Sequence, residues 1–416
     1  MKILIAATHP QQCTGYARVG AMLSNLLADK GHQIVYFGFQ NLAPYAGRSL
    51  HKNVHVIDVG YDTGDPTGFG ETYLPKVIRK YVPDVVILYN DLMLLNRFLD
   101  TVVPVHANVI TYVDLVHDDE SAGLVHGVLT RATRVWVFSD HWKQALLTSH
   151  PYIRTPIDVV PHAVDQCLLD AASGISSSKD AKKALGIDPE MFVVLNTNRN
   201  SYRKALDLSV DAFLRFWKDL DYNENVCLLL NNVIDSPSGY DIRDLVITSA
   251  RRLGLEDTVI PKLLARHILA LPNGGFLDET TLATMYVASD VGLNTCLGEG
   301  FGLCQLEGAA LGIPQIATET GGLVDILRNM EGVHTLIPPV AHLALPRAFV
   351  EHCGTLDIPD TGRVARALRL VYDSNGTVRR KAENVSENVR GTWSVSAFET
   401  AVENGFFHAA RGECGL

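Results

Sequence analysis

The 416-residue sequence has no excess of positive charge and no long apolar run. Its 36 Lys and Arg residues are outnumbered by 46 Asp and Glu residues, which gives a formal net charge of -10. Proteins that bind nucleic acids usually present a basic surface, and a membrane-spanning helix needs about 20 consecutive apolar residues. We therefore expect neither a nucleic-acid partner nor a transmembrane segment. The opening MKILIAATHP lacks the small-residue cleavage site of a signal peptide, so it is interpreted as a first β-strand.

Paired cysteines and the usual dinucleotide fingerprint are also missing. The seven cysteines are widely spaced and form no CxxC motif, which argues against a disulfide framework and against a cysteine metal site. A reduced, soluble protein of the cytoplasm is expected. No GxGxxG follows a predicted strand, since the loop after the first strand reads THPQQCTGYARVG, and this disfavours a nicotinamide-dependent dehydrogenase. No acidic pair at a strand end suggests a divalent cation, so no metal site is predicted.

What the sequence does contain is a repeated alternation of β runs and amphipathic helices, typical of parallel sheets covered by helices. We predict an α/β protein with two Rossmann-like, doubly wound domains facing a central cleft that would hold the ligand. The first domain is expected over 1–170 and the second over 171–394, with a C-terminal helix over about 395–416 crossing back to the first. The small and polar segment 172–180 is interpreted as the connection between them.

Each predicted strand is a short apolar run. Those of the first domain are KILIAAT, QIVYFGF, VHVIDV, DVVILY, VITYVD, RVWVFS and DVVPHA. Those of the second are MFVVLNTN, NVCLLLNN, TVIPKL, SDVGLNT and IPQIAT. Because ligands of such sheets usually bind beyond the carboxyl ends of the strands, a site is expected in the loops that follow these runs.

The stretch GEGFGLCQLEGAALGIP, from Gly298 to Pro314, places a glycine-rich turn between two acids. It follows a predicted strand and leads into the helix-forming run LCQLEGAAL, which Gly312 and Pro314 end. The free amide groups and partial positive charge of a helix N-terminus suit a phosphate. Glu299 and Glu307 would repel phosphate, so they are expected to contact hydroxyl groups of the same ligand. The alternative is that Glu307 caps a neighbouring element and Glu299 is solvated.

A second candidate segment, NTNRNSYRKALDL, also follows a predicted strand. Its cations Arg199, Arg203 and Lys204 fall in the loop and the first helical turn, where positive charge opposes the helix dipole. An anionic ligand would account for them, with Arg gripping phosphate through two hydrogen bonds and Lys acting as a point charge. A surface cluster of salt bridges is the alternative.

These two segments resemble motifs of the retaining glycosyltransferases of family 4, which have the GT-B fold. The run EGFGLCQLE has the spacing and identities of that family's E-x7-E motif. IPQIATETGGLVDIL is similar to a further family motif, with Asp325 where Glu is usual, and VVPHAVD resembles the domain-junction motif, with Ala163 in place of Gly. MYVASDVGLN and VWVFSDHWKQAL resemble two more. The resemblance covers most of the chain, most specifically in the second domain, and leads us to suspect a virus-encoded member.

The resemblance implies a role for individual residues. Arg199 and Lys204 match the basic pair that holds the donor diphosphate and stabilises the leaving group. Glu307 matches the acid that binds the nucleotide ribose, and Glu299 the acid that contacts hydroxyls of the donor sugar. Arg199, Lys204 and Glu299 are thus the predicted catalytic residues. The remaining predicted donor-binding residues are Gly15 in the loop after the first strand, and Gly300, Phe301, Gly302 and Leu303 in the turn.

The acceptor side of the first domain matches the family less closely. Many members have a His near the transferred sugar, at the end of a middle strand, where ITYVDLVHDDE offers Asp114, His117 and Asp118. Asp114, at the strand end itself, is preferred as the residue that faces the acceptor or the sugar, with His117 second. His9, at the carboxyl end of the first strand, stays open as well.

The function implied by the resemblance is that of a retaining hexosyltransferase. Its donor would be a nucleoside diphosphate sugar, GDP-mannose first and UDP-glucose next, with the base near 267–272 and with no obligatory cofactor or metal. The acceptor would be a glycan, a glycoprotein or another hydroxyl compound. The alternatives are a catalytically idle protein that binds a nucleotide sugar or a glycan, and a GT-B nucleotide-sugar epimerase.

Overall fold

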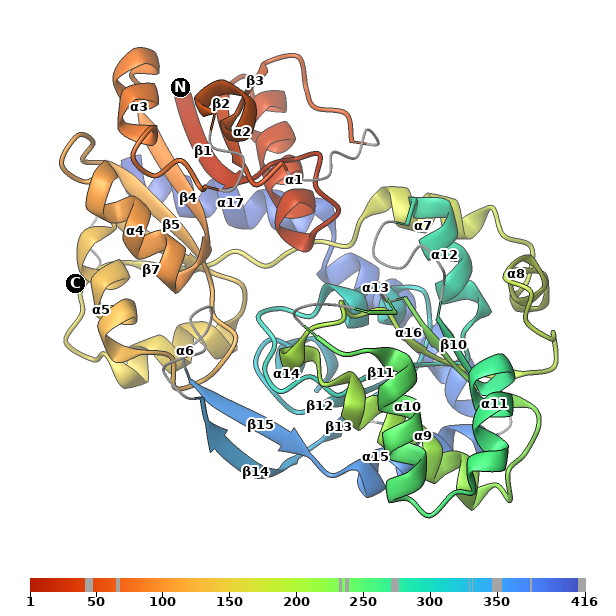
Figure 1. The fold of residues 1–416 in the computed structure, drawn as a ribbon. Helices are drawn as coiled ribbons and strands as arrows, with labels where there is room; N and C mark the ends of the chain where they lie inside the picture. Colours follow the sequence, from red (N-terminus) through yellow and green to blue (C-terminus); the bar gives the residue numbers. More distant parts are fainter. Residues whose placement is uncertain are drawn as a thin grey trace. The chain divides into compact units, whose positions relative to one another are not determined.

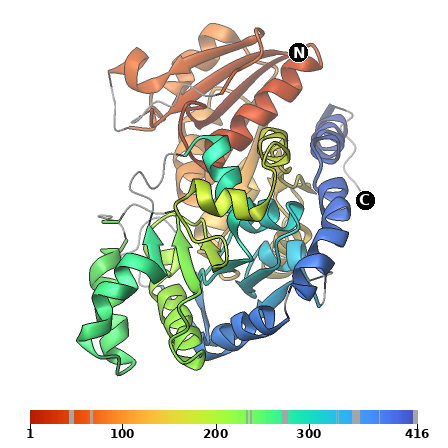
Figure 2. The same ribbon diagram turned by 90° about the vertical axis from the view of Figure 1, so that its right-hand side faces the viewer.

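The computed structural model describes residues 1–41, 48–64, 68–231, 234–235, 239–270, 277–328, 330, 332–345, 354–374 and 376–410, with side chains through Phe406. The contacts of the chain divide it into two compact units. Unit 1 comprises residues 1–162, 345–354 and 396–416, and unit 2 comprises residues 163–344 and 355–395. Each unit has its own parallel sheet with helices packed on it (Figures 1 and 2).

Unit 1 is built on a seven-stranded parallel sheet in the order β3-β2-β1-β4-β5-β6-β7. Its strands are β1 Lys2–Thr8, β2 Gln33–Phe39, β3 Val54–Asp58, β4 Val85–Asp91, β5 Val109–Asp114, β6 Arg134–Val137 and β7 Ile157–Val159. The central strands are buried on both faces, because helices cover both, and this explains why their sequences are continuously apolar. The seven strands predicted for the first domain are confirmed.

The helices of unit 1 begin at short polar side chains. They are α1 Gly15–Asp29, α2 Val59–Thr63, α3 Leu74–Tyr81, α4 Leu92–Val102, α5 Ala122–Arg131, α6 Asp140–Ser149 and α17 Val395–Ala410. Thr14, Asp91 and Ser139 each accept a hydrogen bond from a first-turn amide, at the starts of α1, α4 and α6 respectively. In the part of the chain that the structure describes, no helix is both long and apolar enough to cross a membrane.

Helix α17 follows all of unit 2 in the chain but packs on unit 1. Lys30, which ends α1, forms ion pairs with Glu399 and Glu403 of α17. A Cβ built on Gly405 would lie only 2.6 Å from Nε1 of Trp136 on β6. The missing side chain of Gly405 therefore lets α17 approach the sheet closely.

Unit 2 is built on a six-stranded parallel sheet in the order β10-β9-β8-β11-β12-β13. Its strands are β8 Phe192–Asn196, β9 Val226–Leu230, β10 Ile268–Ala270, β11 Val291–Asn294, β12 Gln315–Thr318 and β13 Thr335–Ile337. A separate antiparallel pair, β14 Pro339–Ala344 and β15 Thr355–Pro359, belongs to the same unit. Along β8, Val194 joins one core cluster whereas Val193 and Leu195 join another, because alternate strand residues face opposite sides of the sheet.

The helices of unit 2 lie between these strands in the chain. The α-helices are α7 Gln166–Ser173, α8 Ser178–Ala184, α9 Leu206–Asp219, α10 Ile242–Arg252, α11 Ile260–Lys262, α12 Glu279–Ala288, α13 Leu303–Ala310, α14 Leu323–Leu327, α15 Thr361–Asp373 and α16 Thr377–Thr392. Shorter turns of helix are η1 Tyr202–Lys204, η2 Asp257–Val259 and η3 Leu263–His267.

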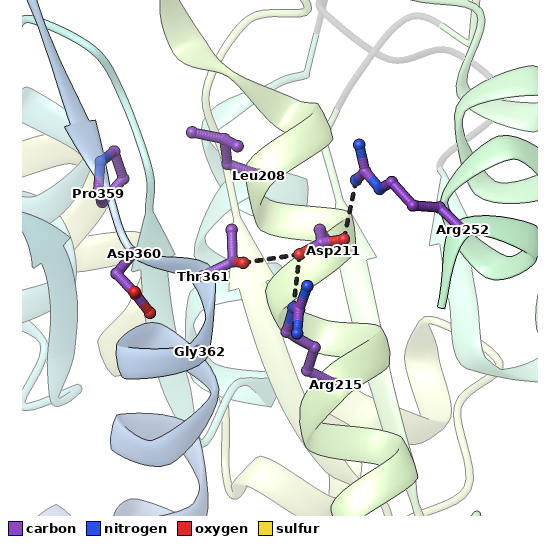
Figure 3. A pocket seen from close by; sticks show the side chains of 8 residues that line it. All are labelled: Leu208, Asp211, Arg215, Arg252, Pro359, Asp360, Thr361 and Gly362. Carbon is purple, nitrogen blue, oxygen red and sulfur yellow. Dashed lines mark hydrogen bonds and ion pairs between the residues drawn. The ribbon is translucent and has the colours of Figure 1, made fainter. Parts of the chain in front are cut away.

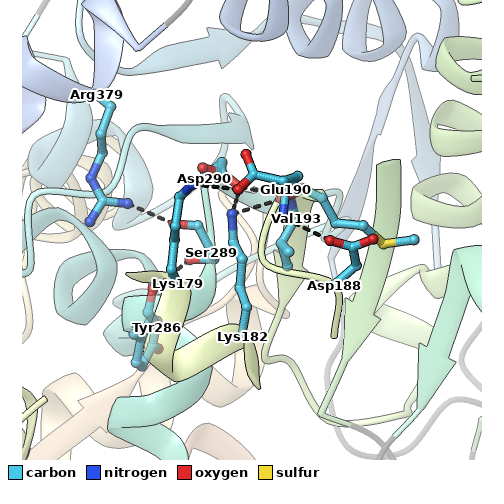
Figure 4. Close-up of polar contacts among 10 residues, drawn as sticks. Lys179, Lys182, Asp188, Glu190, Val193, Tyr286, Ser289, Asp290 and Arg379 are labelled. Atoms are coloured by element: carbon cyan, nitrogen blue, oxygen red, sulfur yellow. Dashed lines mark hydrogen bonds and ion pairs between the residues drawn. The ribbon is translucent and has the colours of Figure 1, made fainter. Parts of the chain in front are cut away.

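A partly buried ion pair, which we call the latch, joins Lys182 of α8 to Asp290 at a distance of 2.9 Å (Figure 4). Asp290 directly precedes β11, and its Oδ2 also accepts the backbone N–H of Val193 at the start of β8, at 2.8 Å. The Lys182 ammonium donates a further hydrogen bond, at 2.7 Å, to the carbonyl of Met191. The latch therefore fixes α8 to the amino ends of the two central strands.

Two expectations about local structure are wrong. TVIPKL, predicted as a strand, is helical, with η2 and α11 in its place. Pro261 lies in the first turn of α11, where its missing amide hydrogen costs nothing, whereas it would break a strand ladder. The segment 172–180, interpreted as a loose connection, contains the end of α7 and the start of α8, which Ser177 caps. The unit boundary itself falls between His162 and Ala163.

Candidate functional site

Two loops of unit 2 meet because the strands before them are neighbours in the sheet. β8 leads into residues 197–205, β11 leads into 295–302, and β8 pairs with β11 in parallel. The N–H of Leu297 donates to the carbonyl of Arg203 at 2.9 Å, and Nη1 of Arg203 donates to the carbonyl of Gly298 at 2.5 Å. The two segments singled out in the sequence thus form one surface at the carboxyl edge of the sheet.

A buried ion pair between Lys204 and Glu299 lies at the centre of this surface. Each residue is only 8% exposed, and the two are 95 positions apart in the chain. Nη1 of Arg203 lies 3.7 Å from the same carboxylate. Burial alone would raise the pKa of Glu299, but the charges of Lys204 and Arg203 outweigh burial and lower it to about 2. The alternative of a solvated Glu299 is therefore wrong.

Lys204 is presented by an unusual backbone turn at Ala205. This residue has φ 45°, in the left-handed region that residues other than glycine rarely adopt. Thr295 holds it there, since its hydroxyl donates to the carbonyl of Ala205 at 2.9 Å. Behind Thr295 lie the buried hydroxyl of Ser209, at 2.6 Å, and the amide of Asn196, which donates to Ser209 at 2.9 Å. This polar network fixes the loop that carries Lys204.

The turn after Glu299 packs tightly against a second glycine-containing turn, at Gly322. Gly302 has φ 100°, and a Cβ there would overlap the side chain of Leu323. A Cβ on Gly322 would in turn overlap the carbonyl of Gly300, and the N–H of Gly322 donates to the carbonyl of Glu299 at 3.0 Å. The sequence interpretation assigned Gly302 to the ligand and gave no role to Gly322, whereas the structure shows that packing requires a glycine at both positions.

Helix α13 starts at this turn with no side chain capping its first amides, because Gly302 occupies the N-cap position. The ring of Phe301 points into the core, where it packs edge-on against Trp393 with centroids 5.3 Å apart. Only the backbone of Phe301 and its neighbours, Gly302 and Leu303, is therefore placed to meet a ligand. An uncapped helix N-terminus favours an anion there.

Glu307 lies further along α13 and is 3% exposed. The hydroxyl of Tyr286 on α12 donates to its Oε2 at 2.8 Å and also to the carbonyl of Cys304 at 3.0 Å. Burial, followed by the negative charge of Glu307, raises the pKa of Tyr286 well above its ordinary value, so the tyrosine remains a donor. The sequence offered Tyr286 within MYVASD, but nothing in its spacing indicated that it would hold Glu307.

The basic residues before α9 differ in environment. Arg199 is exposed, between the buried Asn198 and Asn200. Lys204 is buried in its ion pair, and Arg203, which carried no predicted role of its own, lies beside that pair. Arg199 is thus presented to solvent at the same edge of the sheet.

The first-domain candidates lie in unit 1. Gly15 is the first residue of α1, and the hydroxyl of its neighbour Tyr16 donates to the carboxylate of Asp114 at the end of β5. His117 is buried, and Gly354 lies against it, since a Cβ on Gly354 would come within 2.5 Å of the His117 Cβ. His9 is buried as well. The structure therefore links Tyr16 to Asp114, whereas His117 faces the chain near Gly354.

Two further acids near Asp114 were not predicted. Asp91 ends β4 directly opposite Asp114 in the strand register. Glu120 accepts a hydrogen bond from the N–H of Val116, at 3.3 Å. Burial raises the pKa of Glu120 to about 8, and the charge of Asp114 contributes to the rise. An acid at the end of each of two neighbouring strands is the signal that could have revealed Asp91.

A separate polar cluster surrounds Asp211 on the outer side of unit 2 (Figure 3). The buried carboxylate accepts hydrogen bonds from Arg215 at 2.7 Å, Arg252 at 2.8 Å and Thr361 at 2.7 Å. These partners come from α9, α10 and α15, so the cluster braces three helices. Within the described residues, no group of three or more His, Cys, Asp or Glu side chains could hold a metal ion.

Comparison with known proteins agrees with this geometry. Residues 223–355 match the family of group 1 glycosyl transferases. The matched segment contains Glu299 and Glu307 but begins after Lys204, so the buried ion pair joins a residue inside the segment to one outside it. Part of the predicted base-binding stretch, residues 271–272, lies outside the described residues.

Curated relatives match over part of their length. The chain is 29% identical over 225 residues to D-inositol 3-phosphate glycosyltransferase 2 of Catenulispora acidiphila, covering 53% of this chain and 44% of the relative. It is 31% identical over 153 residues to D-inositol 3-phosphate glycosyltransferase of Actinosynnema mirum, covering 36% of this chain and 33% of the relative. The chain thus spans less than half the length of these two relatives.

Solved structures show that the fold extends over the whole chain. Sucrose-phosphate synthase from Thermosynechococcus elongatus superposes with a TM-score of 0.71 at 17% identity, covering 99% of this chain and all of that one. HepE from Anabaena, in complex with UDP and glucose, superposes with a TM-score of 0.66 at 15% identity, over 98% and 99% of the two chains. The predicted fold class, two Rossmann-like units of GT-B type, is confirmed.

Proposed function

We propose that the chain is a retaining glycosyltransferase that moves a hexose from a nucleoside diphosphate sugar to a hydroxyl acceptor, without an obligatory metal. The observation that carries the proposal is the buried Lys204–Glu299 pair beside the uncapped start of α13. Two cations, Lys204 and Arg203, lie beside the carboxylate of Glu299, and positive charge at this edge of the sheet would attract an anionic ligand. The match to group 1 glycosyl transferases supports the same class of donor.

The chemistry follows from where charge develops. When the bond between the sugar and the diphosphate breaks, negative charge grows on the leaving phosphate. In the proposed mechanism Lys204, Arg199 and the amides at the start of α13 stabilise that charge, and such preorganised donors contribute about 3–4 kcal/mol each. Glu299 would accept hydrogen bonds from sugar hydroxyls and Glu307 from the ribose, held by Tyr286. Retention would come from attack on the same face, with the leaving phosphate as base.

The donor and the acceptor are the finer part of the proposal. We propose a GDP-sugar, GDP-mannose first, with UDP-glucose as the second candidate. The HepE structures contain UDP or UDP-glucose, and the trehalose-6-phosphate structure from E. coli contains UDP-2-fluoro glucose, which supports testing uridine donors in parallel. Asp114, with Tyr16, is proposed to face the acceptor or the transferred sugar. A glycan or glycoprotein acceptor, the viral origin and the cytoplasmic location stay predictions.

Calorimetric titration tests the donor site directly. The protein would be titrated with GDP, UDP, ADP and NAD, each with and without magnesium, and then with the matching nucleotide sugars. We expect saturable binding of one nucleoside diphosphate, independent of magnesium. Binding of NAD alone, or of no nucleotide, would contradict the proposal.

Turnover separates the transferase from its two alternatives. The nucleotide sugar that binds would be incubated with a panel of hydroxyl acceptors, and the product's anomeric configuration would be read by NMR. A retained configuration in a transferred sugar supports the proposal. Epimerisation of the donor without any acceptor would identify an epimerase, and binding without turnover on any acceptor would identify an idle binding protein.

A further inference from the structure

The antiparallel pair β14 and β15, which we call the arm, forms a two-stranded sheet of its own within unit 2 (Figure 1). An isolated two-stranded hairpin is at best marginally stable in water, so contacts elsewhere must hold it. Most of β14 is exposed, including Val340 and Leu343, and no core covers it. On β15, by contrast, Leu356 is buried and Asp357 has a side chain only 15% exposed. The contacts that keep the arm in place are therefore expected around Asp357.

Asp357 makes three contacts that join the arm to the candidate site. Its backbone N–H donates to the carbonyl of Leu297 at 2.9 Å, just before the turn that carries Glu299. Its Oδ2 accepts the hydroxyl of the buried Thr320 at 2.6 Å. Its Oδ1 is bonded to Nδ1 of His342, the residue opposite it on β14, at 2.8 Å. The backbone and the side chain of Asp357 thus tie the arm to two separate loops, at Leu297 and Thr320 respectively.

These two loops also contact each other at the turn that carries Glu299. Leu297 also donates its N–H to Arg203, which lies beside the Lys204–Glu299 pair. Thr320 stands two positions before Gly322, whose N–H supports the carbonyl of Glu299. Displacing Asp357 would therefore release the turn on both of its sides. None of these contacts brings Asp357 to the Lys204–Glu299 pair itself.

We infer that Asp357 is a positioning residue, through which the arm sets the geometry of the 297–303 turn that receives the donor sugar. The inference rests on the proposed function for the identity of that ligand. Because preorganised geometry is worth roughly 100-fold in rate for a misplacement of about 1 Å, a loosened turn should impair the sugar more than the nucleotide. The diphosphate would still meet Arg199 and Lys204, whereas the sugar hydroxyls depend on where Glu299 is held.

The arm also continues into the part of the chain that lies beside the first-domain candidates. Leu345 and Gly354 close the hairpin with a hydrogen bond of 2.8 Å, and both are counted with unit 1. Gly354 packs against His117, three positions after the end of β5. Gly354, directly before β15, thus belongs to unit 1, whereas β15 belongs to unit 2.

The first test is hydrogen exchange on the full chain, which needs no ligand. Asp357→Ala and Thr320→Val should each speed the exchange of the Gly322 amide by about 10-fold or more relative to the wild type, because each removes the side-chain hydrogen bond between Asp357 and the loop of Thr320. Asp360→Ala is the matched control, since Asp360 lies three positions further along and caps α15 through the N–H of Arg363 at 2.7 Å. Unchanged exchange in Asp357→Ala, or equal acceleration in the control, would overturn the inference.

The second test asks whether the turn serves the sugar. Binding of the preferred nucleotide sugar to Asp357→Ala should weaken about 10- to 100-fold, with the nucleoside diphosphate affected less than 3-fold. The double variant with Thr320→Val should add little, because both changes break one link. An equal loss of affinity for the nucleotide sugar and the nucleoside diphosphate would mean that Asp357 has only a structural role. A wild type that binds no nucleotide at all would overturn the proposed function instead, and the exchange result would still decide whether the arm holds the turn.

Discussion

Unit 2 contains one buried and one partly buried pair of lysine and carboxylate, at opposite edges of one sheet. The latch, Lys182 with Asp290, lies where the central strands begin, and Lys204 with Glu299 lies where they end. In the latch, one cation meets one acid, and backbone groups of Met191 and Val193 occupy their remaining positions. The charges and hydrogen bonds of the latch are therefore balanced within the protein.

The second pair is not balanced in this way. Arg203 adds a second cation 3.7 Å from Glu299, and Arg199 is exposed nearby in the same loop. The pair stands on a strained turn at Ala205 and beside an uncapped helix N-terminus. Pairs of lysine and carboxylate thus occur in different surroundings at the two edges, and the second pair has a further cation and an uncapped helix N-terminus beside it. The surroundings of an ion pair, and not the pair itself, indicate a site.

The largest difference between the pairs should appear on removing Lys204. Lys204→Ala would lower kcat/KM for the nucleotide sugar by about 100- to 1,000-fold, because one donor to the leaving diphosphate is lost. It would also cost about 3–5 kcal/mol of unfolding free energy, since Glu299 remains buried without its partner. Steady-state kinetics and urea unfolding measure the two effects. Wild-type kcat/KM in a folded Lys204→Ala variant would remove this lysine from the mechanism.

Removing the other lysine should affect stability alone. Lys182→Ala is expected to cost about 3 kcal/mol, the lower end for a broken buried pair, because the Asp290 side chain is 32% exposed. Below the unfolding transition, kcat/KM per folded molecule should equal that of the wild type. A fall in kcat/KM with no fall in stability would show that the two pairs do not differ as described.

Variants of Glu307 and Glu299 should affect the binding of different parts of the ligand. Glu307→Gln keeps the side chain's size but loses a charged acceptor, and such a hydrogen bond is worth about 1.5–3 kcal/mol. Nucleoside diphosphate binding should weaken about 10- to 100-fold by calorimetry. Glu299→Gln should instead change the preference among nucleotide sugars and leave the free nucleotide bound as before. Equal nucleotide affinity in wild type and Glu307→Gln would contradict the ribose assignment.

The smallest expected effect is a dependence on pH. The folded pKa of Glu299 lies below its unfolded value of about 4.3, so its charged form stabilises the protein above that pH. This contribution is lost as the pH falls toward the folded pKa. The stability difference between wild type and Glu299→Gln should therefore shrink by about 1–2 kcal/mol from pH 6 to pH 3, measured by urea unfolding. A difference that stays constant over this range would mean that Lys204 and Arg203 do not lower the pKa.

Much of the fold could be predicted from the sequence because it depends on local patterns. Continuous apolar runs gave the central strands of both sheets, and the small residues after Glu299 gave the turn into α13. The strand prediction for TVIPKL is wrong because an apolar run containing Pro261 does not reveal whether its backbone has to pair with a neighbouring strand. The arm was not predicted, for a similar reason, since β14 is exposed and its residues show no core-facing alternation.

The residue types of the site could be predicted from the sequence, but the contacts between those residues could not. The alternation of strands and helices placed Lys204 and Glu299 in segments that follow strands, and Glu307 in the helix after the turn. Only the strand order, with β11 beside β8, brings Lys204 to Glu299. Tyr286 and Arg203 gain their roles from α12 and η1 packing onto those loops. Asp91 could have been anticipated, because it ends its strand as Asp114 ends the next one. Interactions across the sheet depend on topology, which a single sequence leaves open.

The position of α17 in the chain bears on how the protein is made. The seven strands of unit 1 leave the ribosome before unit 2, but their sheet receives α17 only after every residue of unit 2 has been synthesised. Domains that fold as units during synthesis usually do so in order from the N-terminus. Here the face of β6 around Trp136, against which Gly405 packs, stays uncovered until the second unit has emerged, so the unit that is begun first is the last to be completed.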